Sequence, residues 1–86
     1  MVSDGGIIID VRSEAEFYSG HIENSLNIPL GALTSNLNHL KDKDQTIITC
    51  CASGMRSGAA KQLLVAKGYT NVINGGSWSS LNAKIK

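Results

Sequence analysis

The sequence predicts one α/β domain, residues 1–86, built on a mostly parallel sheet of four to five strands with helices on both faces. Segments rich in β-branched residues alternate with segments of helical periodicity, the order that right-handed crossovers in a parallel sheet require. The first segment, 7–11, reads Ile-Ile-Ile-Asp-Val, a run typical of a strand that is buried on both faces. A chain of 86 residues has the length of one small domain.

Boundary signals predict a short helix directly after this strand. Ser13 stands three residues before Glu16, which is the spacing of a capping box at a helix N-terminus. Gly20 follows and would end the helix, because glycine adopts the left-handed conformation without steric penalty. We therefore expect a helix over 14–19.

The later elements are predicted from similar patterns. Three leucines spaced i, i+4 and i+7 indicate one buried stripe of a second helix, and glycine or proline residues separate the segments around it. In chain order we expect a strand over 25–28 that Pro29 ends, a helix carrying Leu33, Leu37 and Leu40, a strand over 46–50, a helix over 58–67 that Gly68 stops, a strand over 72–73, a turn over 74–76, and a short helix lined by Trp78, Leu81 and Ile85.

Two adjacent cysteines, Cys50 and Cys51, lie where the third predicted strand meets the third predicted helix. In parallel sheets of this kind, ligands bind beyond the carboxyl ends of the strands. The N–H groups of the turn and the helix N-terminus would concentrate partial positive charge there. A cysteine at that point should be a thiolate more often than a free cysteine is, and the same N–H groups would hold an oxyanion.

The residues alone leave open which cysteine is reactive. Counted from Cys50 the motif is C-x5-R-S, a phosphatase-like spacing, whereas counted from Cys51 it is C-x4-R-S. Cys50 would end the strand as a packed core thiol, with a resolving or phosphatase-type role as the alternative. Cys51 would begin the loop as the reactive thiol, with a small buried hydrophobe as its alternative.

Three residues after the cysteines have roles of their own. Gly54 would allow a tight backbone turn, and Ser57 would cap the following helix. Arg56 would either contact an anion or form an ion pair with Asp10 or Glu16, and the sequence does not separate these two roles.

Three residues elsewhere in the chain are interpreted as structural. We expect His21 to be a cap or a hydrogen-bond anchor, His39 to be solvated, and Trp78 to pack in the core or under a lid.

Composition and charge exclude several classes of protein. No apolar run approaches the roughly 18 residues of a membrane span, and the basic residues are too scattered for a nucleic-acid surface. The histidines and cysteines lack the spacing of a metal site. Adjacent cysteines are too close for an ordinary disulfide, so they leave the compartment open; we favour the cytoplasm, or the periplasm if a leader has been removed.

The charges are also separated along the chain. All seven Asp and Glu residues precede Gln45, so the segment that holds the cysteines carries no acid. This separation is either chance in a small chain or the mark of an anion-handling site that keeps carboxylates away.

Four motifs in order give the chain a resemblance to the rhodanese family. "IIIDVRSEAEF" resembles the family's opening strand with its Asp-x-Arg, and "GHIENSLNIPL" resembles its Gly-His-Ile and Asn-Ile-Pro segment. "CASGMRS" is similar to the six-residue active-site loop Cys-x-x-Gly-x-Arg followed by Ser, and "KGYTNVINGGSW" to the late Gly-Gly and Trp segment. The resemblance runs from Ile7 to Trp78 and implies the small, single-domain form of the rhodanese-like three-layer fold.

The resemblance implies a thiosulfate sulfurtransferase whose nucleophile is Cys51, because Gly54 lies three residues after it, as the family's loop glycine does. Cys51 would take the outer sulfur of a small anionic donor such as thiosulfate and carry it as a persulfide to cyanide, a thiol or a protein acceptor. The implied loop residues are Ala52, Ser53, Gly54, Met55 and Arg56, with Asp10, Arg12 and Ser57 as support for the loop. No metal, organic cofactor, nucleic acid or membrane partner is implied.

The chain also departs from the family pattern. Only six residues precede Ile7, where the family usually has a further strand and helix, so a less covered sheet edge could favour a dimer over the expected monomer. Ala52, Ser53 and Met55 are uncharged, so we expect thiosulfate to be a poor donor. One alternative is therefore a sulfur-carrier or binding module with little turnover alone, and another is a phosphatase or arsenate reductase that uses Cys50.

Overall fold

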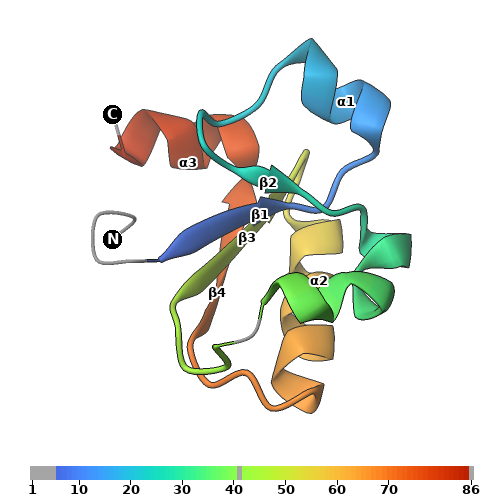
Figure 1. Cartoon of the computed structure of the whole chain (residues 1–86). Coiled ribbons are helices and arrows are strands. Elements are labelled where there is room, and N and C mark those ends of the chain that lie inside the picture. The colour runs from blue at the N-terminus through green and yellow to red at the C-terminus, as the bar shows by residue number, and fades with distance from the viewer. Residues whose placement is uncertain (1–5, 41, 86) are drawn as a thin grey trace.

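Four parallel strands form one sheet at the centre of this computed structural model, which describes residues 6–40 and 42–85, apart from the side chains of 38, 39 and 85 (Figure 1). The strands lie in the order β2-β1-β3-β4, and each neighbouring pair is parallel. The elements are β1 (Ile7–Asp10), α1 (Glu14–Ser19), β2 (Leu26–Asn27), the 3₁₀ helices η2 (Leu30–Ala32) and η3 (Thr34–His39), β3 (Ile47–Cys51), α2 (Met55–Ala66), β4 (Val72–Ser77) and α3 (Trp78–Ile85). The predicted α/β class and parallel sheet are confirmed.

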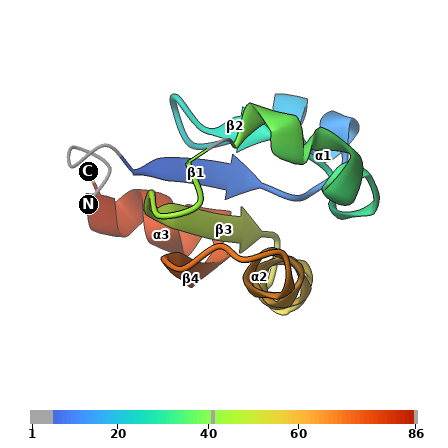
Figure 2. The same cartoon turned by 60° about the horizontal axis from the view of Figure 1, so that its bottom comes forward.

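Alternating side chains of β1 and β3 build an apolar cluster on each face of the sheet, because successive strand residues point to opposite faces. Ile9 and Ile47 belong to the first cluster, whereas Ile8 and Ile48 belong to the second, with Leu81 of α3. From the helical segments, the first cluster takes Leu33, Leu40, Ala60 and Leu64. Helices therefore cover both faces, as Figure 1 shows for α2 and α3, while the arrows of β1 and β3 run side by side in the same direction (Figure 2).

The junction between β3 and α2 is tighter than predicted. The strand continues through Cys51, which pairs with Ser77 of β4, and the helix already begins at Met55, three residues before the expected start at 58. The cause is Gly54, whose φ of +101° lies in the left-handed region and turns the chain at once into the helix. The expectation for Gly54 is confirmed, and α2 ends just before Gly68, close to the predicted stop.

β4 runs through residues 74–76, for which a turn was predicted, so that prediction is wrong. Thr49 pairs with Asn74 and Cys51 with Ser77, which leaves one additional residue on β4 as a bulge. A methyl group at Gly75 would lie 2.9 Å from side-chain atoms of Ile48 and Leu81 and from the carbonyl oxygen of Thr49. Glycine at 75 therefore allows β4 to lie close to β3 and to Leu81 of α3, where a larger side chain would clash.

Two short 3₁₀ helices, η2 and η3, replace the single helix that was predicted for the leucine stripe: Leu37 lies within η3, and Leu33 and Leu40 flank it. Leu33 and Leu40 are fully buried, as the spacing indicated, and Leu37 is partly buried. Within η3, Asn36 has a φ of −118°, outside the helical range, and its side-chain Nδ2 donates to the carbonyl oxygen of Ala32 at 2.7 Å. Asparagine side chains compete in this way with helical hydrogen bonds, which explains the interruption.

The capping box of α1 is confirmed. Ser13 Oγ accepts from the backbone N–H of Glu16, and the Glu16 side chain accepts from the backbone N–H of Ser13. Gly20 ends the helix, but its φ of 162° is extended, so the expected left-handed conformation is wrong. A methyl group at Gly20 would lie 3.2 Å from the Trp78 ring, and this contact gives a physical reason for glycine here.

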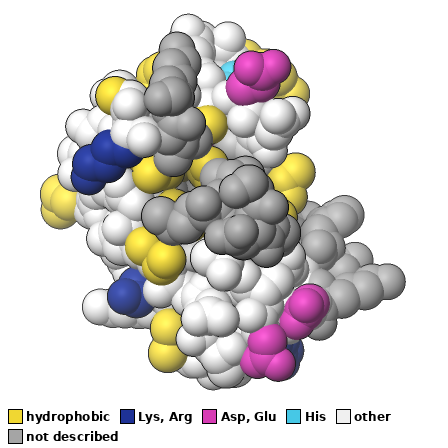
Figure 3. Space-filling model, turned by 90° about the vertical axis from the view of Figure 1, so that its left-hand side faces the viewer, with side chains coloured by type: hydrophobic (Ala, Val, Ile, Leu, Met, Phe, Trp, Pro, Cys, Tyr) yellow, Lys and Arg dark blue, Asp and Glu magenta, His cyan; other side chains and the backbone are white. Residues whose placement is uncertain are grey.

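Within the described ranges 6–40 and 42–85, no helix is long and apolar enough to cross a membrane. Among the same residues, no group of three or more His, Cys, Asp or Glu side chains is placed to hold a metal ion. On the face shown in Figure 3, hydrophobic side chains form separate patches between polar ones.

Candidate active site

Cys51 ends β3, and its side chain is fully buried on the face of the sheet covered by α2. Its sulfur accepts a hydrogen bond from the backbone N–H of Gly54 at 2.9 Å and another from that of Ser57 at 3.4 Å. Gly54 lies at the N-cap of α2 and Ser57 in its first turn. Backbone N–H groups at these positions have no partner within the helix. The sulfur therefore lies at the positive end of the helix dipole.

These donors lower the pKa of Cys51 below the ordinary value for a thiol. Burial is the largest single influence and acts to raise this pKa, but the hydrogen bond with the Ser57 side chain and those from the N–H groups of Ser57, Ser53 and Gly54 together outweigh it. The expectation of a site that favours the thiolate thus has a structural cause at Cys51.

Cys50, the neighbouring residue, points to the opposite face. It is fully buried in the cluster formed by Ile8, Ile22, Ile48 and Leu81. Burial, aided by the negative charge of Asp10, raises the pKa of Cys50 to about 12, so its thiol stays protonated at neutral pH. The interpretation of Cys50 as a packed core thiol is confirmed.

Ser57 contacts the Cys51 sulfur but does not cap the helix, so that prediction is wrong. The residue at the N-cap is Gly54, which has no capping side chain, and Ser57 lies one turn further along, fully buried. The distance from Cys51 Sγ to Ser57 Oγ is 3.6 Å, and Ser57 Oγ also lies 2.6 Å from Asn74 Oδ1 on β4. Sequence reasoning missed Asn74, because it lay in the residues interpreted as a turn.

Arg56 pairs with Glu16 of α1, with distances of 2.8 and 3.0 Å between its guanidinium and the two carboxylate oxygens. Of the two partners that the sequence left open, Glu16 is confirmed, and the contact with an anion stays a prediction. Hydrogen bonds from Arg56 and from Ser13 lower the pKa of Glu16 to about 2. Both side chains are partly exposed, with 39% of each accessible, so solvent screens the pair.

Asp10 and Arg12 form a buried ion pair on the Cys50 face, with 2.7 Å between Arg12 Nη2 and Asp10 Oδ2. Arg12 also donates to the carbonyl oxygen of Gly20 at 2.6 Å and stacks over the Trp78 ring at 4.8 Å. No hydrogen bond of the described residues joins this pair to residues 52–57. Strand alternation sends both side chains to the α1 and α3 side, and the expectation that Asp10 and Arg12 support the loop stays a prediction.

The remaining predicted residues divide between loop and scaffold. Ala52, Ser53 and Met55 are exposed on the loop, where Ser53 contributes its backbone N–H to Cys51. His21 Nδ1 lies 2.8 Å from the carbonyl oxygen of Phe17, which confirms its role as a hydrogen-bond anchor. Trp78 is half-buried against the Cys50 cluster. The side chains of His39 and Ile85 lie outside the described part of the chain.

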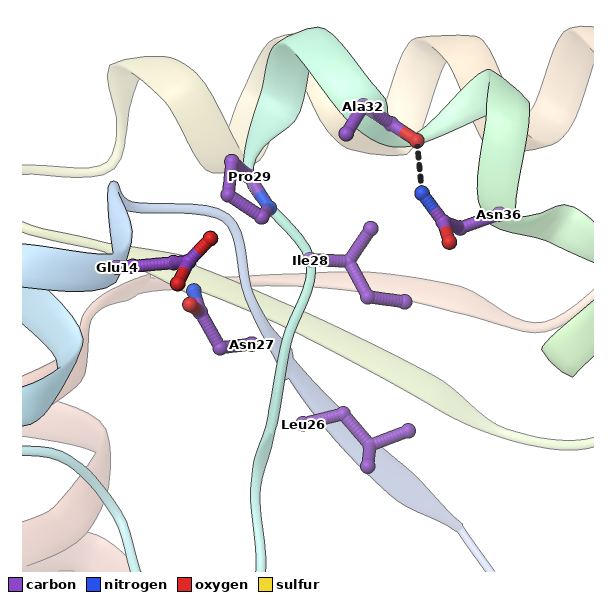
Figure 4. Close-up of a pocket in the computed structure, with 7 residues that line it drawn as sticks. All are labelled: Glu14, Leu26, Asn27, Ile28, Pro29, Ala32 and Asn36. Atoms are coloured by element: carbon purple, nitrogen blue, oxygen red, sulfur yellow. Dashed lines mark hydrogen bonds between the residues drawn. The ribbon is translucent and has the colours of Figure 1, made fainter.

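A pocket of about 430 Å³ lies apart from the cysteine loop, beside the edge strand β2 (Figure 4). Its lining residues are Glu14, Leu26, Asn27, Ile28, Pro29, Ala32 and Asn36. None of them belongs to residues 50–57, so the pocket is not part of the candidate active site.

The rhodanese-like domain model matches residues 1–84. Thiosulfate sulfurtransferase PspE of Escherichia coli is 36% identical over 69 residues, covering 79% of this chain and 66% of that protein. The solved structure of a rhodanese with anions from E. coli superposes with a TM-score of 0.76 and 36% identity, covering 86% of this chain and 88% of that one. The chain belongs to the rhodanese-like domain family, and the expected family and fold are confirmed.

Two further relatives carry other names. The putative sulfur carrier protein YrkF of Bacillus subtilis is 37% identical over 67 residues, covering 78% of this chain and 36% of that protein. The dual specificity phosphatase Cdc25 of Arabidopsis thaliana is 39% identical over 62 residues, covering 67% of this chain and 42% of that protein. The chain thus spans just under two thirds of PspE and less than half of these two proteins.

Proposed function

We propose that this protein is a sulfurtransferase that moves sulfane sulfur through a persulfide on Cys51. The observation that carries the proposal is the hydrogen-bonded environment of the Cys51 sulfur: two backbone N–H groups at the start of α2 donate to it, at 2.9 and 3.4 Å. These donors are fixed before any reaction occurs, so they stabilise negative charge without a reorganisation cost.

The reaction consists of two displacements at sulfur. The Cys51 thiolate attacks the outer sulfur of a donor such as thiosulfate, a bond forms between the two sulfurs, and the bond to the sulfonate sulfur breaks. Sulfite leaves with that electron pair, and Cys51 carries a terminal persulfide anion. Cyanide, a thiol or a protein thiol then attacks the outer sulfur, which regenerates the Cys51 thiolate.

The loop backbone is the proposed holder of the outer sulfur. The backbone N–H groups from Ala52 to Arg56 belong to the loop and to the start of α2. The outer sulfur of the negative persulfide would extend toward these groups. The Cys51 sulfur has no exposed surface, so a donor reaches it past the exposed loop residues Ala52, Ser53 and Met55. No metal or organic cofactor takes part in this proposal.

A sulfur-carrier module is the second candidate, and two observations favour it. The exposed loop side chains Ala52, Ser53 and Met55 are neutral, and the cation at Arg56 is engaged by Glu16 at 2.8 Å. Little free positive charge remains to attract a doubly negative donor such as thiosulfate. In this case the sulfur would come from a partner protein, and turnover with thiosulfate and cyanide would be weak.

A phosphatase or arsenate reductase that uses Cys50 is disfavoured. The reactive cysteine of such an enzyme must be a thiolate within reach of the loop N–H groups. Cys50 instead lies among aliphatic side chains, where burial raises its pKa to about 12.

The test is the intact mass of the protein after incubation with thiosulfate, and separately with a low-molecular-weight persulfide. The Cys50→Ala variant should gain one sulfur, about 32 Da, since the nucleophile of covalent transfer is retained. The matched Cys51→Ala variant should gain nothing. Sulfur gained from the persulfide but not from thiosulfate would favour the carrier, and sulfur that follows Cys50 would contradict both candidates.

A further inference from the structure

The hydroxyl group of Ser57 has more acceptors around it than it can serve. Its Oγ lies 2.6 Å from Asn74 Oδ1, 3.0 Å from the carbonyl oxygen of Gly54 and 3.6 Å from Cys51 Sγ. A serine hydroxyl carries a single hydrogen. Ser57 therefore cannot donate to Asn74 and to an ionised Cys51 at the same time.

The backbone fixes which atom of Asn74 faces Ser57. The N–H of Gly76 donates to Asn74 Oδ1 at 3.0 Å, and an N–H can only donate, so that atom is the amide oxygen rather than the nitrogen. An amide oxygen can only accept. The contact of 2.6 Å therefore requires the Ser57 hydroxyl to be the donor, and its hydrogen points to Asn74.

This direction decides how Ser57 interacts with a neutral Cys51 thiol. With the Ser57 hydrogen turned to Asn74, the contact of 3.6 Å is one in which the Cys51 thiol donates to Ser57 Oγ. When the S–H bond ionises and its proton leaves to solvent, that donor disappears. The Ser57 hydroxyl can then rotate about its Cβ–Oγ bond and donate to the sulfur anion, which breaks only its hydrogen bond to Asn74.

The two partners of Ser57 differ in whether water can replace the hydroxyl as their hydrogen-bond donor. Asn74 is exposed and keeps the N–H of Gly76, so water can replace the hydroxyl at its oxygen. The Cys51 sulfur is fully buried, and no water can replace the hydroxyl there. The rotation therefore favours the sulfur once it is charged.

We propose that Asn74 is a positioning residue acting through Ser57: it holds the Ser57 hydroxyl while Cys51 is a neutral thiol and releases it when the sulfur becomes anionic. The proposal rests on the proposed function only in taking Cys51 as the reactive thiol. Among the described residues, the charged group on the side of this sulfur is Arg56 with its partner Glu16, whereas Asp10 and Cys50 lie on the opposite face of the sheet. No hydrogen bond or ion pair of the described residues joins Asn74 to any of them.

The test follows the ultraviolet absorbance of the thiolate against pH in a Cys50→Ala background, where Cys51 is the only thiol. Replacing Asn74 by Ala frees the Ser57 hydroxyl, so the thiolate-to-thiol ratio at a fixed pH should rise about three- to tenfold, as expected for one hydrogen bond. Replacing Ser57 by Ala should lower this ratio. In the Ser57→Ala background, Asn74→Ala should have no further effect.

Several outcomes would overturn the proposal. If Asn74 only supports the β4 bulge through Gly76, Asn74→Ala would change the ratio equally in both backgrounds. A fall in the ratio, or no change with Ser57 present, would also contradict it. Should Asn74→Ala not fold, Asn74→Asp keeps both acceptor contacts, and it must lower the ratio more with Ser57 than with Ala at 57.

The titration is separate from the test of the proposed function. It reports the ionisation of Cys51 whether or not sulfur is transferred. A titration that behaves as described, in a protein that gains no sulfur from thiosulfate or a persulfide, would contradict the sulfurtransferase and leave the role of Asn74 intact.

Discussion

The two faces of β3 surround two adjacent cysteines with opposite environments. On the α3 side, Cys50 is packed among isoleucine and leucine side chains, and burial raises its pKa to about 12. On the α2 side, Cys51 also has no exposed surface but is less deeply buried, and hydrogen bonds with Ser57, Ser53 and Gly54 outweigh burial and lower its pKa. The exposed fraction of the two thiols is the same, so the difference comes from how deeply each is buried and from the hydrogen-bond donors around it.

The difference lies in what each face offers to a charged sulfur. Strand alternation sends consecutive side chains to opposite faces, and only one of these faces has the N-terminus of a helix directly beyond the strand. A buried thiol is therefore inert or reactive according to the backbone donors within reach, and not according to burial alone.

The largest expected effect tests the packing on the Cys50 side. Gly75→Ala would place a methyl group 2.9 Å from Ile48, Leu81 and the Thr49 carbonyl. Overpacking of this kind lowers the free energy of unfolding by about 1–3 kcal/mol, and contact with a backbone atom places it at the upper end. Gly31→Ala is the matched control, because its methyl group has no neighbour within 4 Å. Equal urea midpoints for the two variants would show that the layers are not tightly packed at Gly75.

A smaller effect tests the polarity of the same face. Cys50→Ser puts a hydroxyl into an aliphatic cluster, whereas Cys50→Ala only removes the sulfur. An unsatisfied buried hydroxyl costs about 1–3 kcal/mol, so the serine variant should unfold at lower urea concentration than the alanine variant. A serine variant as stable as the alanine variant would indicate that Cys50 has a polar partner.

The protonation of Cys50 also predicts a pH dependence. Its pKa rises from 9.0 to about 12 in the folded protein, so between these values the folded state keeps a proton that the unfolded state has lost. Stability should therefore fall as pH rises above 9, relative to its value at lower pH. The free energy of unfolding in urea should therefore fall more between pH 7 and pH 10 for the wild type than for Cys50→Ala. An equal fall in both proteins would argue against a protonated Cys50 as the cause.

The smallest effect concerns the ion pair beside the Cys51 loop. Glu16→Gln removes the charge that pairs with Arg56, but both side chains are 39% accessible, so the melting temperature should fall by only a few degrees at most. The pKa of Glu16 is lowered from 4.5 to about 2. The difference in melting temperature between Glu16→Gln and wild type should therefore be present above pH 4.5 and vanish as pH falls toward 2. A difference that survives at pH 2 would show that the effect is not electrostatic.

Much of the fold followed from the sequence, because local signals and the tertiary structure agree there. The capping box at Ser13, the buried run that starts at Ile7 and the leucines at 33 and 40 all have the predicted roles. Where the sequence misled, a contact distant in sequence decided the outcome. Gly75 looked like a turn residue, but Ile48, Leu81 and Thr49 require a glycine at that point of β4.

The candidate site was predictable in part for the same reason. Strand alternation separated Cys50 from Cys51, and Gly54 marked the turn into α2. The contact between Ser57 and Asn74 joins residues 17 positions apart, on α2 and β4. No spacing or composition signal in the chain indicates that contact.

The most direct test of the account is to titrate each thiol alone by its thiolate absorbance, in Cys50→Ala and in Cys51→Ala. We predict that Cys51, the thiol left in the first variant, ionises below the ordinary 9.0, and that Cys50 in the second stays protonated until about pH 12. The reverse order, with Cys50 ionising at the lower pH, would contradict the assignment of the reactive sulfur to Cys51.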